Sequence, residues 1–541
     1  MIVGGGSAGC VLANRLSADP AVSVLLLEAG GRNDGMLVRM PAAVSQLIKN
    51  EGQHNWGFWT DPEPHLDGRR LWWPRGKGLG GSSAINGMIY VRGHRRDYDE
   101  WRQLGLAGWS WDDVAPYFHR LERHHRAGEH HGGDGPLHVS AGESSSPFNA
   151  AFIAAGRQAG YPVNANFNGP EQAGFGPFDL TVSNGRRWSA AAAYLDPVRD
   201  RPNLTIVTGA RITAIRLERG RAVGVDYVTG KRGAVSHAAA GEVLLCAGAV
   251  QSPHILQLSG IGAPDDLAAA GVRVRHALPG VGGNLQDHLD VVMNWRTRGL
   301  TTAYSATKGL RQLAVGLRYM MTGQGIGRQQ FLETGAFLPS REGLDRPDIQ
   351  IHAVLGVFRE HGKYQPAEDG FTLHLCQLRP ESRGRIALRS ADPFADPAIR
   401  ADYLATPEDR RVLREAVRDR PARGGAGGAR AVHDGRDLAG RGGGERRGDR
   451  HLGPRDGGDD LPPGRHLRDG GGRRRERGRR RGAARPRAGR AAGGGRVGDA
   501  AAGRRQHQRA DDHDRGEGGG SDSGEGGVGG IALFPSLLGR G

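Results

Sequence analysis

Three glycines and a carboxylate near the start of the chain have the types and spacing of a nucleotide-binding turn. Gly4, Gly6 and Gly9 form a G-x-G-x-x-G run, and Glu28 follows about twenty residues later. Glycines permit a tight turn in which backbone N–H groups approach a pyrophosphate, and the N-terminus of a following helix adds partial positive charge. Glu28 is placed to accept a hydrogen bond from a ribose 2′-OH. The pattern predicts dinucleotide binding; the alternative is a chance glycine-rich turn.

A strand–turn–helix–strand unit is needed to position these residues. We expect a short strand before Gly4 and a second strand from 22 to 27. The helix between them should carry Val11, Leu12 and Leu16 on one face. Only three residues precede Gly4, so the first strand lacks its N-terminal half. Either the true N-terminus starts upstream, or this edge is poorly anchored.

A second glycine-rich segment, residues 75–101, reads RGKGLGGSSAINGMIYVRGHRRDYDEW. Its glycines lead into the small polar residues Ser82, Ser83 and Asn86. Such a segment can lie flat against an extended ligand and donate backbone and side-chain hydrogen bonds to it. The alternative interpretation is a flexible surface loop.

With these two glycine-rich segments, the chain resembles the glucose–methanol–choline (GMC) flavin oxidoreductases, and most closely the choline and alcohol dehydrogenases. Residues 75–101 resemble the first signature of that family, and GAVQSPHILQLSGIG (248–262) resembles the second. Three further segments, 186–197, 278–288 and 383–399, are similar to family landmarks. The resemblance covers residues 1 to about 418 and implies FAD as the cofactor.

The fold that this resemblance implies is α/β (α+β). It has a Rossmann-like FAD-binding domain built from discontinuous segments, 1–100 and 186–290. Residues 101–185 and 291–418 would form a substrate domain with a mixed or antiparallel sheet, including the start of the family's C-terminal domain.

Carried over residue by residue, the resemblance also implies a set of cofactor-binding residues. Ile212 would contact the adenine, although it could equally be a strand core residue, and the two roles are compatible. The other residues are Gly4, Gly6, Ser7, Ala8, Gly9, Glu28 and Ala29 at the ADP end, and Gly78, Gly80, Ser82, Ser83, Asn86, Gly87, Met88 and Ile89 along the flavin and ribityl chain.

Further strands are expected in the middle of the chain. Residues 241–249 read as a buried strand that returns to the FAD sheet, and 348–357 and 371–378 alternate like strands of the substrate-domain sheet. His352 and His374 fall on these two strands. Each could face the flavin, but a structural histidine with a satisfied ring is the favoured interpretation.

Composition also limits the partners, metal sites and location that the chain can be expected to have. The first 418 of 541 residues hold 47 basic and 41 acidic groups, an ordinary balance that gives no reason to expect nucleic acid as a partner. Cys10, Cys246 and Cys376 have no disulfide or zinc spacing, so we expect buried, reduced thiols and no metal. The chain opens with no signal peptide and has no apolar run long enough to span a bilayer. We therefore expect a cytoplasmic protein, at most peripheral to a membrane.

The character of the sequence changes after a predicted helix at 406–418 that has a Thr N-cap. Residues 419–541 hold 27 Arg, no Lys and 36 Gly, with no aromatic residue before Phe534. Apolar residues show no helical or strand period there, and such a composition cannot bury enough surface to offset the entropy of ordering. This tail is expected to be disordered and of low complexity.

The resemblance implies that this same region should carry the catalytic pair, a His in an HPxGT motif and an Asn in an NxNxPT motif. Neither is present in this reading frame, so no catalytic residue is assigned. GC-rich codons can be chosen for residues 461–469 that, read one base later, encode Tyr-His-Pro-Val-Gly-Thr-Cys-Gly-Met. In the same way, codons for residues 505–517 encode Gly-Asn-Thr-Asn-Ala-Pro-Thr-Thr-Met-Ile-Ala-Glu-Lys. Both motifs share one frame and the family order, which indicates a frameshift near residue 418. The last residues, 531–541, would then be translated past a lost stop codon.

Two other interpretations of the tail remain. A metal site at His507 and His513 lacks cysteines and a helix that places both ligands on one face. An Arg/Gly-rich RNA-binding arm on an inactive FAD-binding remnant is the alternative function, although the tail lacks Lys and interleaved aromatics.

The resemblance implies that a small alcohol or choline is oxidised to an aldehyde. Its hydride would pass to flavin N5, and the electrons then to a quinone or another carrier. Loss of the His/Asn region predicts that this polypeptide is impaired.

Overall fold

The computed structural model describes residues 1–49, 51–142, 146–230, 233–359 and 362–418, and the backbone of 531–533. The chain divides into two units, residues 1–443 with 527–541 and residues 444–526, and every described residue belongs to the first unit. The predicted tail, 419–541, therefore lies outside the described residues, except for 531–533.

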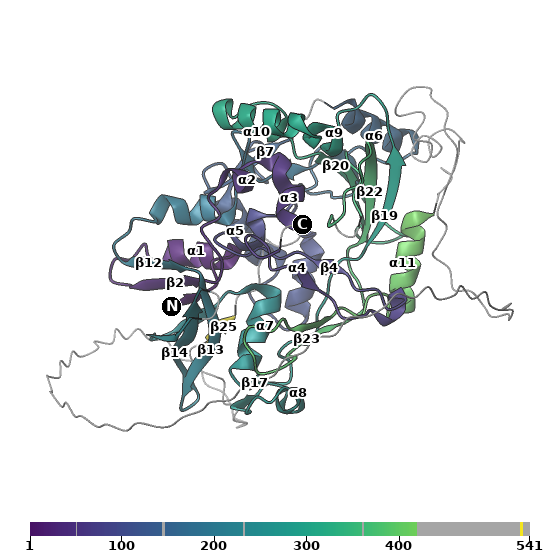
Figure 1. The fold of residues 1–541 in the computed structure, drawn as a ribbon. Coiled ribbons are helices and arrows are strands. Elements are labelled where there is room, and N and C mark those ends of the chain that lie inside the picture. Colours follow the sequence, from purple (N-terminus) through teal and green to yellow (C-terminus); the bar gives the residue numbers. More distant parts are fainter. Residues whose placement is uncertain (50, 143–145, 231–232, 360–361, 419–530, 534–541) are drawn as a thin grey trace, which may run out of the picture. The chain divides into compact units, whose positions relative to one another are not determined.

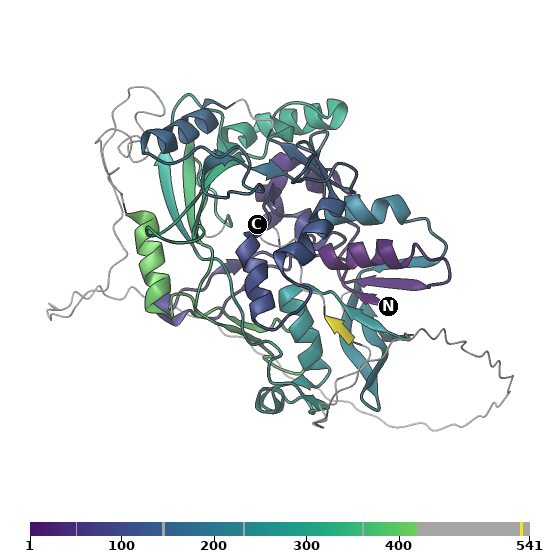
Figure 2. The same cartoon turned by 180° about the vertical axis from the view of Figure 1, so that it is seen from behind.

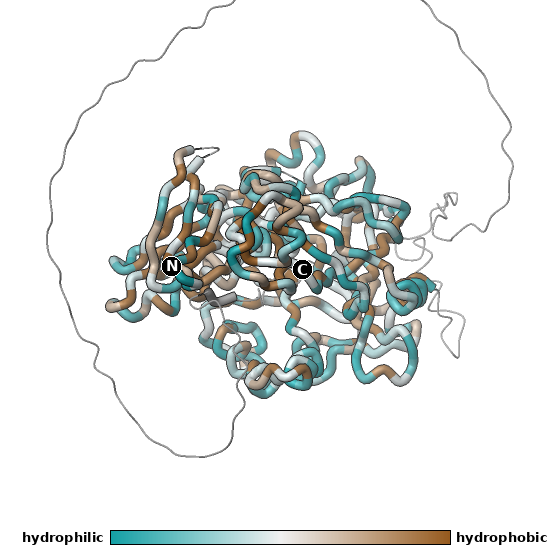
Figure 3. Tube along the Cα trace, turned by 90° about the horizontal axis from the view of Figure 1, so that it is seen from below, coloured by the Kyte–Doolittle hydropathy of each residue, from teal (hydrophilic) through white to brown (hydrophobic). Residues whose placement is uncertain are grey.

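A five-stranded sheet in the order β12-β2-β1-β16-β25 carries the predicted nucleotide-binding turn (Figure 1). All four strand pairs are parallel. Parallel strands are usually buried on both faces, which explains the Val- and Leu-rich runs in these segments. Figure 3 shows such hydrophobic residues in brown along the strands beside the N-terminus. The strand bounds are β1 Ile2–Val3, β2 Val24–Glu28, β12 Leu204–Thr208, β16 Val243–Leu245 and β25 Ile531–Leu533.

Strand β1 lies at the centre of this sheet, although it has only two residues. Ile2 and Val3 are buried and pair with β2 on one side and β16 on the other. The amino group of Met1 donates to the backbone oxygen of Glu242 at 2.9 Å. A poorly anchored edge is therefore wrong as an explanation of the short strand. Residues 531–533 of the predicted tail add the outer strand β25, drawn in yellow in Figure 2.

Helix α1, Ser7–Leu16, packs on the sheet through small residues. It buries Gly9, Cys10 and Ala13, whereas Leu16 is 36% exposed and Val11 and Leu12 are only partly buried. Of the predicted apolar face, Val11 and Leu12 pack against the core as partly buried residues, whereas Leu16 is exposed and that part of the prediction was wrong. A Cβ atom at Gly9 would lie 1.9 Å from the backbone oxygen of Gly4, so the helix approaches the turn too closely for any side chain at this position.

A second five-stranded sheet, ordered β19-β22-β21-β20-β8, is wholly antiparallel. Its residues Phe371, Leu373 and Leu375 are buried in one core with Phe148 and Phe152. The strands predicted at 348–357 and 371–378 are confirmed as β21 and β22. The bounds are β8 Gly174–Pro177, β19 Asp290–Arg296, β20 Leu332–Leu338, β21 Ile349–Val354 and β22 Gly370–Gln377.

The other sheets of the described residues have two to four strands each. Their strands are β3 Phe58–Trp59, β4 Trp72–Trp73, β5 Ile89–Tyr90, β6 Glu122–His124, β7 Leu137–Ala141, β9 Asp179–Leu180, β10 Val182–Ser183, β11 Arg186–Arg187, β13 Ala210–Glu218, β14 Arg221–Thr229, β15 Val235–Ala239, β17 Ile261–Gly262, β18 His276–Ala277, β23 Arg385–Ala387 and β24 Ala398–Arg400.

The remaining α-helices differ in length and in exposure. The last, α11, is the helix predicted at 406–418, and the Thr406 hydroxyl caps it by accepting from the Asp409 N–H at 3.2 Å. Among the residues that the structure describes, no helix has both the length and the apolar content needed to span a bilayer. The helices are α2 Met36–Arg39, α3 Val44–Lys49, α4 Arg95–Gln103, α5 Trp111–Leu121, α6 Pro147–Gln158, α7 Gly248–Leu258, α8 Pro264–Ala269, α9 Ala303–Thr307, α10 Leu310–Thr322 and α11 Pro407–Val417.

Candidate functional site

A cavity of about 1060 Å³ is lined by residues of both five-stranded sheets. It is as large as the upper end of small-molecule pockets, about 300–1,000 Å³, and so has room for an extended ligand. Its wall includes these predicted cofactor-binding residues: Gly4, Gly6, Ser7, Ala8, Glu28, Ala29, Ser82, Asn86, Gly87, Ile89 and Ile212. Ile212 is also buried in the strand core, which confirms that expectation, while its contact with an adenine stays a prediction.

The N-terminus of α1 faces this cavity without a cap. Gly6 provides no side-chain hydrogen bond to the helix, and the first turn holds no acidic residue. The first N–H groups of an α-helix lack intrahelical acceptors, and their partial positive charge attracts anions. Ser7 and Ala8 of this turn lie in the cavity wall. The arrangement fits a pyrophosphate.

Glu28 joins the two glycine-rich segments to each other. Its Oε2 accepts from the Gly5 N–H at 2.7 Å, and its Oε1 accepts from the N–H groups of Gly30 and Gly78 at 2.7 and 2.9 Å. A carboxylate has about four acceptor positions, so three are used within the protein. Glu28 still lines the cavity, and binding of a ribose hydroxyl by its remaining position stays a prediction.

The other predicted cofactor residues, Gly9, Gly78, Gly80, Ser83 and Met88, lie behind the wall and shape it. Gly78 and Gly80 adopt φ angles of +119° and +90°, which side chains disfavour. The Ser83 hydroxyl donates to the Gly80 backbone oxygen at 2.5 Å, and Met88 is fully buried. Direct contact of these residues with a cofactor stays a prediction.

Arg187 is a positioning residue that the sequence did not single out. Its side chain is buried, and one guanidinium nitrogen donates to both the backbone and side-chain oxygens of Asn86. Its Nε donates to the backbone oxygen of Val38 at 3.0 Å. Burial lowers the pKa of Arg187 to about 9. The landmark at 186–197 marked this segment, but nothing in the pattern connected it to Asn86.

Two buried amides in the cavity wall have unused polar atoms. The Nε2 of Gln251 and the Oε1 of Gln330 have no hydrogen-bond partner within the described residues. Their other amide atoms are engaged, with His254 and with the backbone oxygen of Gly87 respectively. An unsatisfied buried polar atom is costly, so both amides fit polar groups of a bound ligand.

Histidines from the antiparallel sheet form another part of the wall. His352 on β21 lies directly opposite His374 on β22, and both line the cavity. The Nδ1 of His374 lies 3.1 Å from the Asp290 carboxylate. Burial lowers the pKa of His352 to about 4, so its ring is neutral at pH 7. His374 thus has the partner expected of a structural histidine, while contact of either ring with a flavin stays a prediction.

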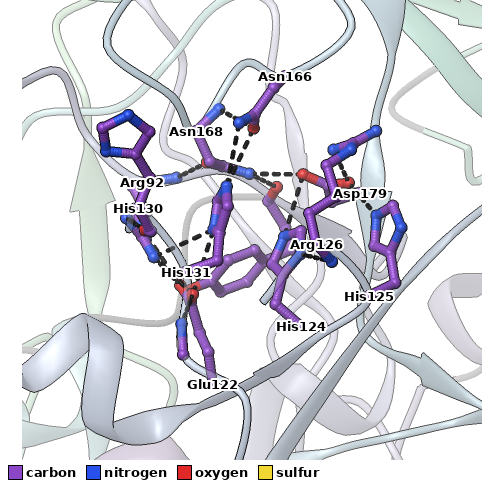
Figure 4. A network of polar contacts seen from close by, with 12 residues as sticks. Arg92, Glu122, His124, His125, Arg126, His130, His131, Asn166, Asn168 and Asp179 are labelled. Carbon is purple, nitrogen blue, oxygen red and sulfur yellow. Dashed lines mark hydrogen bonds and ion pairs between the residues drawn. The ribbon is translucent and has the colours of Figure 1, made fainter. Parts of the chain in front are cut away.

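A different histidine cluster lies on the sheet β5-β9-β7-β6 (Figure 4). His124, His125 and Asp179 bring three candidate metal ligands within 4.8 Å of one another. However, Asp179 Oδ1 already accepts from Arg126 and from His125, both at 2.8 Å, and its Oδ2 accepts from Asn168 at 3.0 Å. Because the Arg126 guanidinium supplies the positive charge, we interpret the cluster as a structural ion-pair network.

The segments decoded as the family's catalytic His and Asn motifs, 461–469 and 505–517, lie outside the described residues. His507 and His513 lie there as well.

Comparisons with known proteins give a consistent result. GMC oxidoreductase family models match residues 1–290 and 380–429. The chain is 43% identical over 427 residues to mitochondrial choline dehydrogenase from Mus musculus, covering 77% of this chain and 71% of that protein. It is also 43% identical over 417 residues to the alcohol dehydrogenase [acceptor] of Pseudomonas putida, covering 76% and 75%. Among solved structures, pyridoxine 4-oxidase from Mesorbium loti is similar with a TM-score of 0.69, 32% identity and 80% of each chain covered.

Proposed function

Because the chain belongs to the GMC oxidoreductase family, whose members bind FAD, we propose that residues 1–418 form the cofactor and substrate chamber of an FAD-dependent alcohol dehydrogenase. We further propose that this polypeptide lacks the catalytic base of that reaction. The observation that carries the proposal is that one cavity is lined by the uncapped N-terminus of α1, by the second glycine-rich segment and by the histidines of the antiparallel sheet.

The residues of the cavity divide into two groups by their chemistry. In the first group, Ser7 and Ala8 offer backbone N–H groups for the pyrophosphate, and Glu28 holds both glycine segments in register. Bound there, FAD would accept a hydride from the carbinol carbon of the alcohol.

In the second group, Gln330, His352 and His374 provide polar groups that would orient the hydroxyl of a small alcohol. A neutral His352 ring can donate or accept a hydrogen bond, depending on its tautomer. The apolar residues Phe331, Leu332 and Val354 lie in the same wall and would exclude water from the reacting carbon.

Support for a lost base comes from the extent of the similarity. The alignments with the choline and alcohol dehydrogenases cover 76–77% of this chain, the share that residues 1–418 make up, and 71–75% of those relatives. About a quarter of this chain and about a quarter of each relative therefore remain unaligned. A frameshift near residue 418 accounts for both unaligned parts. The proton acceptor that an alcohol oxidation requires would then be missing from the translated product.

The experiment compares this exact polypeptide with a version whose reading frame is restored after codon 418. We expect the exact chain to retain partial FAD binding with negligible alcohol-dependent reduction of an artificial electron acceptor. The restored protein should be a yellow, active flavoprotein. Turnover by the exact chain that is lost on removal of FAD would refute the missing base, and failure of the restored protein to bind flavin would refute the FAD assignment.

Sequencing the gene across codons 410 to 425 tests the frameshift directly. An intact frame there, together with RNA binding by the full chain that a fragment ending at residue 418 lacks, would favour the RNA-binding alternative instead.

As electron acceptor we propose a quinone or another carrier in preference to oxygen. The relative from Pseudomonas putida is an alcohol dehydrogenase [acceptor], whereas other relatives, such as one from Serratia proteamaculans at 45% identity, are oxygen-dependent choline dehydrogenases. Rates of the restored protein with a soluble quinone analogue and with dissolved oxygen, at equal alcohol concentration, decide between these acceptors. Faster turnover with oxygen would contradict this proposal.

A further inference from the structure

The exposed face of α10 is the apolar face of that helix, the reverse of an ordinary surface helix. Leu310, Leu313, Leu317, Met320 and Met321 are between 51% and 82% exposed. With about 100° of rotation per residue, these five side chains fall within an arc of about 100°. Isolated exposed hydrophobic residues are common, but a contiguous stripe on one helix indicates an interaction surface.

The inward side of α10 is fixed by one residue. Tyr319 is 5% exposed, and its hydroxyl lies 3.1 Å from the backbone oxygen of Arg39 and 3.0 Å from that of Gly185. Tyr319 is on the side of the helix opposite Leu310, so this anchor directs the apolar stripe outward. It also holds the helix near α2, where Met36 and Leu37 are both 41% exposed. Figure 1 shows α10 at the top of the described unit, with α2 below it.

The charged residues on α10 and in the chain segment on either side of it are all cationic. Between Asp290 and Glu333 the chain contains no acidic residue and six cations. Lys308, Arg311 and Arg318 are exposed on or next to α10. Arg39, Arg186 and Arg328 lie close enough to Tyr319 for their charges to lower the pKa of its phenol, which burial raises. Long cationic side chains beside an apolar stripe can reach anionic headgroups while their stems remain in the apolar layer.

We propose that α10 is a peripheral docking helix for an anionic lipid bilayer, with its Leu/Met stripe in the headgroup–acyl boundary and its cations on the lipid phosphates. A second copy of this chain is the competing occupant. A two-fold contact sets each patch against itself, so it would bring Arg311, Arg318 and Lys308 of both copies together. Anionic lipid is complementary to both the stripe and the charges. The inference rests on the proposed function and deepens it, since a bilayer surface is where the proposed quinone acceptor would be reached.

The test uses the full chain with a fluorophore on a single introduced thiol. Cys10, Cys246 and Cys376 are all buried, so the label reacts with the new cysteine. One variant carries an environment-sensitive dye at Leu313→Cys. The matched control carries it at Leu104→Cys, which is 79% exposed at the end of α4. Each is mixed with phosphatidylcholine vesicles, with and without phosphatidylglycerol. The Arg-rich segment 419–541 is present in both proteins, so any vesicle binding that it causes affects both equally.

We expect a blue shift of the dye at position 313 with phosphatidylglycerol vesicles and no comparable shift at position 104. Leu317→Ser with Met321→Ser, and separately Arg311→Glu with Arg318→Glu, should each weaken the partitioning of the position-313 label by at least about tenfold. Unchanged thermal unfolding of these variants would show that the fold is retained.

Three outcomes would overturn the proposal. They are an absent shift at position 313, an equal shift at both positions, or a shift without vesicles accompanied by a doubled mass in light scattering. The last would identify a second copy as the occupant. Because this readout requires no alcohol oxidation, it separates failure of the docking helix from failure of the proposed enzymatic function.

Discussion

Arg187 and Asn86 are joined by two hydrogen bonds from one guanidinium nitrogen, 2.6 Å to the backbone oxygen of Asn86 and 2.9 Å to its side-chain oxygen. Asn86 faces the cavity, while Arg187 is buried behind it. A charged side chain in this position fixes the end of the second glycine-rich segment by satisfying both oxygens of Asn86. The shape of the cavity wall therefore depends on a residue that does not line it.

Replacing Arg187 with methionine should destabilise the protein and loosen this wall. The change keeps apolar volume but leaves the backbone oxygens of Val38 and Asn86 without their donor, and each buried unsatisfied group costs about 1–3 kcal/mol. We expect the free energy of unfolding in urea to fall by about 3 kcal/mol, with weaker flavin binding. Arg186→Met, at the exposed neighbouring position, is the control and should stay within about 0.5 kcal/mol of the parent. Equal effects at both positions would contradict this role.

A methyl group at Gly9 should separate α1 from the glycine turn. The added Cβ would lie 1.9 Å from the backbone oxygen of Gly4, so the helix must shift, and overpacking of this kind costs about 1–3 kcal/mol. We expect Gly9→Ala to lower both unfolding stability and FAD affinity. Gly31→Ala is the matched control, because a Cβ there meets nothing within 4 Å. Normal FAD affinity in Gly9→Ala would show that close packing of α1 on the turn is not needed for the site.

Substituting Glu28 by glutamine should uncouple the two glycine segments. An amide has one oxygen and one NH₂ group, so it cannot accept from Gly5 on one side and from Gly30 and Gly78 on the other. Hydrogen bonds to a charged group contribute about 1.5–3 kcal/mol each, and we expect at least a tenfold loss of FAD affinity. Equilibrium titration with FAD, followed by flavin fluorescence, measures it. Asp34→Asn, a carboxylate with an exposed side chain, is the control.

Acidification should destabilise the protein partly through His254. Its side chain is 2% exposed, and burial lowers its pKa from 6.5 to about 4. The unfolded chain therefore binds this proton more readily than the folded one, so the contribution to stability is complete above pH 6.5 and decreases as the pH falls towards 4. The expected loss at pH 4 is about 3 kcal/mol.

Urea unfolding of His254→Gln at several pH values tests this expectation. The variant should lose less stability than the parent between pH 6.5 and 4, whereas the exposed His65→Gln should follow the parent. An identical pH dependence in His254→Gln and the parent would mean that another group controls acid sensitivity.

Local patterns predicted the local structure of this chain well. The turn at Gly4, the strand that ends at Glu28 and the cap of α11 at Thr406 each depend on residues close together in sequence, and each is confirmed. The burial of Gly9, Cys10 and Ala13 on α1 could not be predicted from hydropathy, because it depends on how closely Gly9 approaches the turn.

The rest of the site depends on contacts between distant segments. Arg187 meets Asn86 across 101 residues, and Gln330 meets Gly87 across 243. No periodicity or motif indicates such a pairing, since it arises only when the two sheets enclose the cavity. The strands that carry His352 and His374 could be predicted because alternation is a local pattern. Their position in one cavity wall could not, because it depends on contacts between distant segments.

The buried thiol of Cys10 gives the glycine turn an internal reporter of its own motion. Its Sγ donates to the Gly5 backbone oxygen at 3.2 Å, and burial raises the thiol pKa far above its usual range. An alkylating reagent can therefore modify this sulfur only while the turn is transiently open. The rate of that modification measures how often the turn opens, and a dinucleotide that closes over the turn should slow it without any change in the chemistry of the sulfur.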